Sequence, residues 1–268
     1  MPEATGSGPD DTGRDGSDPD GTGRDRPGAE TGDIAMLPST RPRKRRWLRR
    51  ILLVVVALVL APFVLTLVYR FVPPVSTLMV WRAVTLQPVT RDWVALEDVA
   101  PVLVRSLVVS EDARFCEHFG VDMVELQKVL DDYAAGEATR GASTIPMQVA
   151  KNLFLWPGRD VVRKAVELPI AAWIDLTLPK ARILEIYLNI AEWGPEGEFG
   201  VAAGAERAFG TTPDKLSARQ AALLVAVLPN PVARSAGKPT GGVSRRANTI
   251  AARARQSGGL LDCVYPDG

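Results

Sequence analysis

The chain has 268 residues, of which 46% are hydrophobic and 24% charged, and its formal net charge is +1. This length allows one substantial domain with appended segments, and the apolar content is sufficient for a buried core, which excludes a wholly disordered chain. The net charge alone identifies no class of partner, but the charges are unevenly distributed along the sequence.

Residues 1–40 are rich in Gly, Pro, Asp, Ser and Thr and contain scarcely any large apolar side chain. Such a segment cannot bury enough apolar surface to offset the conformational entropy lost on ordering. We therefore predict a disordered tail. Its repeated DGTGRD-like phrases resemble a calcium-binding repeat only weakly.

A basic segment, residues 41–50, precedes an uncharged apolar run at residues 51–69. At about 1.5 Å of rise per residue, this run nearly matches a hydrocarbon core of roughly 30 Å, and membrane helices tolerate an internal proline such as Pro62. A cleaved signal peptide is the rival interpretation. The run is too long and too far from the N-terminus for one, and no small-residue cleavage motif follows it.

The sequence therefore predicts a single-pass anchor in the inner membrane, with the tail in the cytoplasm and residues 70–268 outside. The basic segment could also be a nucleic-acid patch, but membrane topology and anionic lipid headgroups explain it better beside a span. We expect no nucleic-acid partner.

The chain has two cysteines, Cys116 and Cys263. A disulfide is permitted outside the cytoplasm, but two cysteines so far apart form no framework, and the second lies in a tail expected to fray. We expect free thiols. A metal site at Cys116 and His118 lacks the paired-ligand spacing of zinc sites.

The remainder of the chain predicts a mainly α-helical domain, because no convincing alternating run bounded by turns is present. A short amphipathic segment within residues 71–87 either lies at the membrane face or packs into the domain. Residues 136–147 lack a strong period and predict a loop over the functional site. Helical patterns cover residues 99–110, 121–135, 159–175 and 180–191, and a further helix follows Ser217 and Gln220, which have capping-box spacing.

The stretch SEDARFCEHFGVD, residues 110–122, carries the first candidate for chemistry. Glu111 is close in sequence to aromatic residues and to Arg114. Such neighbours can hold a carboxylate in place and partly remove it from water, as a general base requires. The alternative is an acidic pair that caps a helix and forms a surface salt bridge. In the same way, Arg163 and Glu167 fall one turn apart on a helix, and an exposed ion pair is their simplest interpretation. Pro169 is expected to kink that helix just after Glu167.

A second stretch, GASTIPMQVAKNLFL, is followed in order by RKAVELPIAAWID, ARILEIYLNIAEWG, FGVAAGAERAFG and LSARQAALLVAVLPNP. Together with the first stretch, this series resembles the motifs of the peptidoglycan glycosyltransferases. NLFLWPGR, YLNIAEWG and VLPNP resemble the monofunctional, membrane-anchored branch of that family. The resemblance implies a lysozyme-like helical glycosyltransferase domain over residues 70–255, with a C-terminal tail at 256–268.

The resemblance also implies that the chain polymerises lipid II into β-1,4-linked glycan with inversion and release of polyprenyl diphosphate. Glu111 matches the family's catalytic base, and Glu167 matches its second glutamate, which either holds a divalent cation or orients donors. The matched diphosphate contacts are Lys151, Arg163 and Lys164. Further predicted substrate contacts are Asp112, Phe115, His118, Ser143, Thr144, Gln148 and Asn152.

The resemblance implies no permanently bound cofactor and leaves open a Mg or Mn ion at the diphosphate. The implied partners are lipid II, the growing glycan strand and the membrane, and cell-division or cell-wall synthesis proteins are left open. Pro146 and Met147 depart from the Gln or hydroxyl residues common in the family. A glycan-cleaving enzyme on the same fold and a non-catalytic scaffold protein remain alternatives, whereas a nucleotide-binding loop lacks the required second glycine.

Overall fold

The computed structural model describes residues 43–137, 141–158 and 160–265. The chain divides into two compact units, residues 1–47 and 48–268. The disorder predicted for residues 1–40 lies outside the described residues.

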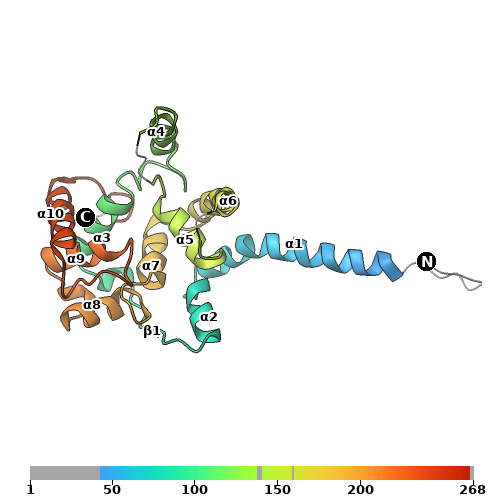
Figure 1. Cartoon of the computed structure of the whole chain (residues 1–268), viewed down its shortest axis with the longest axis horizontal. Helices are drawn as coiled ribbons and strands as arrows, with labels where there is room; N and C mark the ends of the chain where they lie inside the picture. The colour runs from blue at the N-terminus through green and yellow to red at the C-terminus, as the bar shows by residue number, and fades with distance from the viewer. Residues whose placement is uncertain (1–42, 138–140, 159, 266–268) are drawn as a thin grey trace, which may run out of the picture. The chain divides into compact units, whose positions relative to one another are not determined.

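Helix α1, Arg43–Tyr69, contains the predicted apolar span (Figure 1). It continues through Pro62, whose carbonyl accepts a hydrogen bond from the Thr66 hydroxyl at 2.7 Å. Near its end, α1 is attached to the domain by aromatic contacts. The Phe63 and Trp173 rings meet edge to face, with centroids 5.8 Å apart, and Tyr69 stacks on Phe154. The C-terminal part of the long apolar helix is therefore packed against the domain.

The domain is mainly helical, as predicted. Its other α-helices are α2 Thr77–Val84, α3 Pro101–Glu111, α4 Met123–Ala134, α5 Ile145–Phe154, α6 Val161–Thr177, α7 Lys180–Ile190, α8 Val201–Phe209, α9 Ala218–Val227 and α10 Gly241–Gln256. Two 3₁₀ turns span Leu96–Asp98 and Pro213–Lys215. Strands β1, Thr90–Arg91, and β2, Glu198–Phe199, pair in parallel with Thr90 opposite Glu198.

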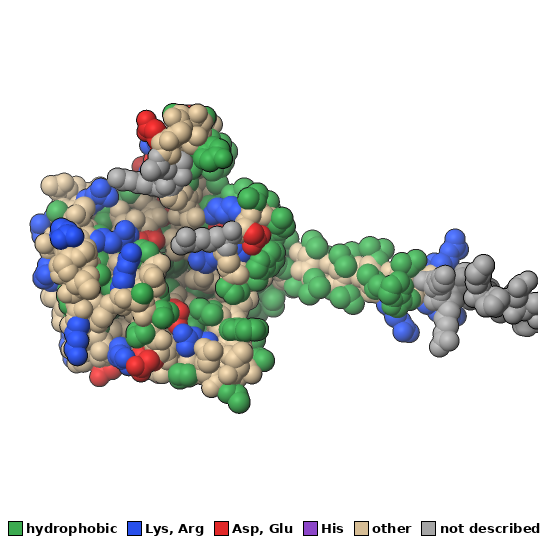
Figure 2. Space-filling view, in the orientation of Figure 1, with side chains coloured by type: hydrophobic (Ala, Val, Ile, Leu, Met, Phe, Trp, Pro, Cys, Tyr) green, Lys and Arg blue, Asp and Glu red, His purple; other side chains and the backbone are tan. Residues whose placement is uncertain are grey.

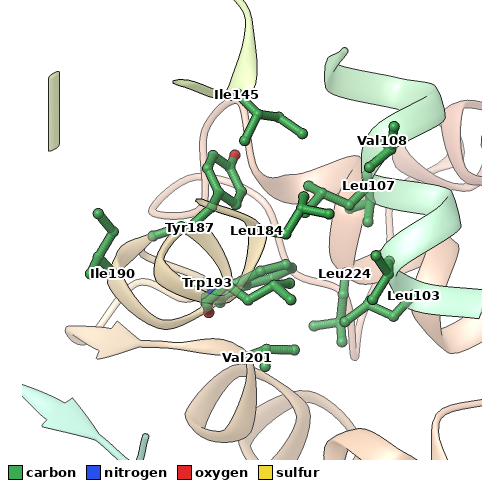
Figure 3. Packing of buried hydrophobic residues seen from close by; sticks show 14 of the residues in the cluster. Leu103, Leu107, Val108, Ile145, Leu184, Tyr187, Ile190, Trp193, Val201 and Leu224 are labelled. Carbon is green, nitrogen blue, oxygen red and sulfur yellow. The ribbon is translucent and has the colours of Figure 1, made fainter. Parts of the chain in front are cut away.

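The core that supports α3 is formed by leucines of three helices. Leu107 of α3, Leu184 of α7 and Leu224 of α9 are fully buried, and Figure 3 shows them packed around Trp193. Burying one such side chain stabilises the fold by roughly 1.5–3 kcal/mol. Because α3 packs against both α9 and α10, its last residue, Glu111, is held at a fixed place in the domain.

Helix α9 begins as its sequence predicts. The Ser217 side chain accepts from the Gln220 backbone N–H, and the Gln220 side chain accepts from the Ser217 backbone N–H, which completes the capping box. This cap satisfies two backbone donors that would otherwise have no partner at the helix start.

The loop predicted for residues 136–147 ends earlier than expected, because α5 begins at Ile145. The Thr144 hydroxyl caps this helix by accepting from the Met147 N–H at 3.3 Å, and Pro146 occupies the first turn, where a missing N–H costs nothing. The departure at Pro146 and Met147 therefore falls on two buried residues at the start of a helix.

Helix α2 places its apolar residues on two sides. Met79 is buried in the core, whereas Val80, Trp81 and Val84 are exposed. Figure 2 shows hydrophobic side chains gathered on this part of the domain, close to α1. One side of α2 thus packs into the domain, and contact of the other side with the membrane stays a prediction.

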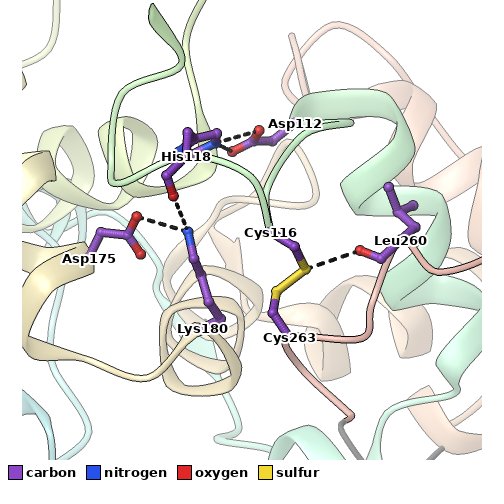
Figure 4. The surroundings of a disulfide bond; sticks show 7 residues. All are labelled: Asp112, Cys116, His118, Asp175, Lys180, Leu260 and Cys263. Carbon is purple, nitrogen blue, oxygen red and sulfur yellow. Dashed lines mark hydrogen bonds and ion pairs between the residues drawn. A yellow bond between two sulfur atoms is a disulfide. The ribbon is translucent and has the colours of Figure 1, made fainter.

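The expectation of free thiols is wrong, because Cys116 and Cys263 form a disulfide with a Cα–Cα distance of 5.6 Å (Figure 4). The two cysteines are 147 residues apart in the sequence, but they meet because the chain after α10 folds back onto the segment following α3. Leu261 and Val264 are buried there, so this part of the tail is packed and not frayed. The disulfide thereby ties the Glu111 segment to the C-terminal end of the described chain.

We expect Cys263→Ser to lower stability by about 2–4 kcal/mol, because the bridge closes a long loop and so restricts the unfolded chain. The measurement is the midpoint of thermal unfolding of the detergent-solubilised protein, beside wild type with and without reductant. Reductant should lower the midpoint of wild type and leave that of the variant unchanged. Equal midpoints for the variant and oxidised wild type would contradict the prediction.

Candidate active site

A cavity of about 1050 Å³ opens between the C-terminal end of α3 and helices α5, α6 and α10. Figure 2 shows Lys and Arg side chains gathered on the face that carries α10. The side chains and glycines that line the cavity are Val109, Ser110, Glu111, Gly141, Ser143, Gln148, Lys151, Gly158, Arg163, Lys164, Glu167, Pro229, Arg246, Thr249, Ile250 and Arg253.

Glu111 is the carboxylate at the α3 end of this cavity, with 13% of its side chain exposed. Its Oε2 accepts a hydrogen bond from Gln148 Nε2 at 3.2 Å, and its Oε1 accepts one from the Ser110 hydroxyl at 3.2 Å. An Arg246 nitrogen lies 3.6 Å from Oε1. Glu111 is thus held by donors, partly shielded from water and accessible from the cavity, as a general base must be.

Asp112, Phe115 and His118 do not line the cavity. The Asp112 carboxylate is buried, where it lies 2.9 Å from His118 Nε2 and accepts from the Ile145 backbone N–H at 2.8 Å. Figure 4 shows the Asp112–His118 contact beside the disulfide. Phe115 is fully buried beneath the Lys180 ammonium. These contacts join the Glu111 segment to the start of α5 and to α7, and substrate contact by the three residues stays a prediction.

The substrate contacts predicted at and just before α5 lie in three different environments. Ser143, Gln148 and Lys151 line the cavity, while Asn152 lines an adjoining pocket of about 230 Å³. Thr144 is buried as the helix cap and its hydroxyl also donates to the Gly120 carbonyl. The structure therefore assigns Thr144 a structural contact, and its contact with substrate stays a prediction.

Burial lowers the pKa of the Lys151 ammonium, and the negative charge of Glu167 partly opposes that effect. An anion bound in the cavity would favour the charged form of the lysine further. Lys151 is therefore a cation whose desolvation is only partly compensated before substrate binds.

Arg163, Lys164 and Glu167 form one cluster on α6. An Arg163 nitrogen lies 2.6 Å from Glu167 Oε2, and Lys164 Nζ lies 2.7 Å from Oε1. The Arg163 and Glu167 side chains are only 9% and 3% exposed, so the pair is not the exposed ion pair of the simplest interpretation. Arg163 Nε is buried and has no hydrogen-bond partner among the described residues. A buried donor of this kind favours an anionic or polar ligand beside it.

The Glu167 carboxylate does not fit a divalent ion in this arrangement, because each of its oxygens is already paired with a protein cation. Among the described residues, no group of three or more His, Cys, Asp and Glu side chains is arranged to hold a metal ion. Glu167 contacts Arg163 and Lys164 instead, and Lys164 also donates to the Ser143 hydroxyl at 2.8 Å. A role of Glu167 in orienting these two donors stays a prediction.

The sequence interpretation missed α10, which contributes Arg246, Thr249, Ile250 and Arg253 to the cavity wall. Their spacing of three, four and seven residues places them on one helical face. This spacing within SRRANTIAARARQ could have indicated a cationic helix face in the site. The same spacing is also typical of an ordinary basic helix exposed to solvent. Only the fold shows that this face lines the same cavity as α6.

The chain matches the Transglycosylase family model over residues 79–255. A biosynthetic peptidoglycan transglycosylase of Rhodopseudomonas palustris strain TIE-1 is 56% identical over 217 residues, covering 81% of this chain and 92% of the relative. The relative of that name from strain HaA2 is 59% identical, with 80% and 94% covered. Another, from Rhizobium etli, is 50% identical, with 84% and 99% covered. The chain therefore belongs to the transglycosylase family of glycosyltransferases.

Proposed function

We propose that this protein polymerises lipid II into peptidoglycan glycan strands. The observation that carries the proposal is that one cavity brings Glu111 together with Lys151, Arg163 and Lys164. A glycosyl transfer from a lipid diphosphate needs a base for the attacking hydroxyl and cations for the departing anion, and this cavity contains both.

In the proposed reaction, Glu111 accepts the proton of the 4-hydroxyl of the incoming disaccharide unit. The hydroxyl oxygen forms a bond to the anomeric carbon of the growing chain, while the bond from that carbon to the diphosphate oxygen breaks. The diphosphate leaves with the bonding electron pair. Attack from the face opposite the leaving group converts an α-linked donor into a β-1,4-linked strand.

The α6 cluster supports the leaving-group role. Lys164 is the accessible cation of the cluster, with 37% of its side chain exposed, and Arg163 is held rigid by Glu167. Hydrogen bonds between charged partners are shorter and stronger than neutral ones, so these groups can stabilise the diphosphate as its charge develops.

Helix α10 also contributes cations, because Arg246 and Arg253 line the cavity. Cations from three helices in the cavity that contains the Glu111 carboxylate suit a reaction that joins two lipid-linked diphosphates. This arrangement favours a polymerase over a glycan-cleaving enzyme, because a finished glycan carries no diphosphate along its length.

The test is incubation of the solubilised protein with labelled lipid II, followed by treatment with or without a glycan hydrolase. We expect high-molecular-weight product that the hydrolase degrades. A scaffold protein would leave lipid II unchanged, and a glycan-cleaving enzyme would instead degrade preformed strands. Either result would refute the proposal.

We further propose that the anchor lies in the inner membrane with residues 70–268 outside the cytoplasm. The basic residues before the span and the disulfide in the domain support this orientation, because cytoplasmic thiols are kept reduced. Membranes prepared without reductant should yield protein whose cysteines resist alkylation until dithiothreitol is added. Immediate alkylation of both cysteines would indicate a cytoplasmic domain.

A further inference from the structure

A hydrogen-bonded series of three side chains runs from the core to the catalytic cavity. Tyr187 of α7 is 2% exposed, and its hydroxyl donates to Gln148 Oε1 of α5 at 3.0 Å. Gln148 Nε2 then donates to Glu111 Oε2 of α3 at 3.2 Å. Figure 3 shows the Tyr187 ring among core side chains, with its hydroxyl on the side towards Ile145, the first residue of α5. The series therefore joins three helices.

The direction of both hydrogen bonds follows from the groups at the two ends of the series, the Glu111 carboxylate and the Tyr187 phenol. An ionised carboxylate only accepts hydrogen bonds, so the amide must present its NH₂ group to Glu111. Its oxygen is then left for the phenol, which must donate. Burial, together with the negative charge of Glu111, raises the pKa of Tyr187 well above its usual value, so the phenol keeps its proton. A reversed amide would place its oxygen against the carboxylate.

We propose that Tyr187 is a positioning residue for glycosyl transfer, acting through the amide of Gln148 to orient the Glu111 carboxylate. The Tyr187 hydroxyl fixes the amide, and the amide fixes Oε2. Oε1 is thereby left beside Ser110 and Arg246, both of which line the cavity. This role rests on the proposed function of Glu111 as the base. It also accounts for Gln148, whose two polar atoms are both engaged within the protein.

The charged groups around Glu111 come from other helices and are unchanged by the test below. Arg246 of α10 lies 3.6 Å from Oε1, and Lys151 of α5 is close enough to sense the charge of Glu111. Removing the Tyr187 hydroxyl alters none of these charges. Any change in proton transfer must therefore come through the amide.

The test is Tyr187→Phe, which retains the ring and removes only the hydroxyl. We expect kcat for lipid II polymerisation to fall about tenfold with KM nearly unchanged, since a misoriented base affects the transition state more than substrate binding. The acid limb of the kcat–pH profile should move to higher pH, because the ionised carboxylate loses a well-oriented donor. Gln148→Met, which keeps the length of the side chain but has no donor, should move the limb in the same direction.

The double variant decides whether the two residues act as a unit. Adding Tyr187→Phe to Gln148→Met should cause no further loss, whereas independent effects would multiply. Tyr265→Phe is the matched control, because the Tyr265 hydroxyl makes no hydrogen bond with the described residues. This control should retain the wild-type rate and pH profile.

The possible results separate this role from the base assignment. If Glu111→Gln keeps its turnover, the base assignment fails and the positioning role fails with it. If Glu111→Gln is inactive but Tyr187→Phe keeps the wild-type pH profile and changes only the melting temperature, Tyr187 is purely structural and the positioning role alone is refuted. Multiplying losses in the double variant would refute it as well.

Discussion

Glu111→Gln is expected to abolish polymerisation, with a loss on the order of 10² or more in kcat, because the amide cannot accept the proton of the attacking hydroxyl. The fold should be preserved. The new amide can turn its oxygen towards Gln148 Nε2, which now donates to Glu111 Oε2, and its NH₂ group towards the Ser110 hydroxyl, which can accept. The measurement is initial velocity on labelled lipid II, with thermal unfolding recorded beside it.

Glu117→Gln is the matched control for this substitution. It makes the same chemical change in the same segment, but Glu117 has 62% of its side chain exposed and pairs with Arg114. Its rate should equal that of wild type within about twofold, because exposed ion pairs contribute little. Residual turnover of Glu111→Gln within about tenfold of wild type would contradict the base assignment.

Helices and their ends could be predicted from the sequence where local chemistry determines them. The Ser217 and Gln220 spacing correctly placed the start of α9, and the apolar run at residues 51–69 correctly predicted a helix, since it lies within α1. The spacing of Arg163 and Glu167 predicted their contact, since residues four apart share a helical face. Their burial was not predictable, because it depends on what packs around α6.

Features that depend on distant parts of the chain were missed. The disulfide requires that residues 257–265 return to the α3–α4 connection, and no local signal encodes that return. The cations of α10 face the cavity only because α3, α9 and α10 pack together. The hydrogen bond of the Tyr187 hydroxyl was missed for the same reason. The sequence YLNI predicts only an apolar helix face, and the partner of the hydroxyl, Gln148, lies on a different helix, α5.

The second large effect is expected for Lys164→Ala, which should reduce lipid II consumption about ten- to a hundredfold. Charge-assisted contacts to phosphate contribute roughly 1.5–3 kcal/mol, which corresponds to a loss on that scale. The remaining cluster should persist, because Arg163 still pairs with Glu167 at 2.6 Å when Lys164 is absent. Binding of finished glycan, which has no diphosphate along its length, should be little affected.

Lys128→Ala provides the comparison that separates diphosphate binding from helix stabilisation. Lys128 pairs with Glu125 three residues earlier on α4, as Lys164 pairs with Glu167 three residues later on α6, but Lys128 does not line the cavity. Each variant loses an ion pair between residues three apart, but Glu125 is 45% exposed and Glu167 only 3%. Lys128→Ala should therefore change the melting temperature little, because exposed pairs contribute about 0.2–1 kcal/mol, and Lys164→Ala should lower it more, because it leaves a buried carboxylate with one partner fewer. Only Lys164→Ala should lose turnover. Unimpaired polymerisation by Lys164→Ala would reduce the α6 cluster to a structural ion pair, and the departing diphosphate would then need stabilisation from Lys151 or from the arginines of α10.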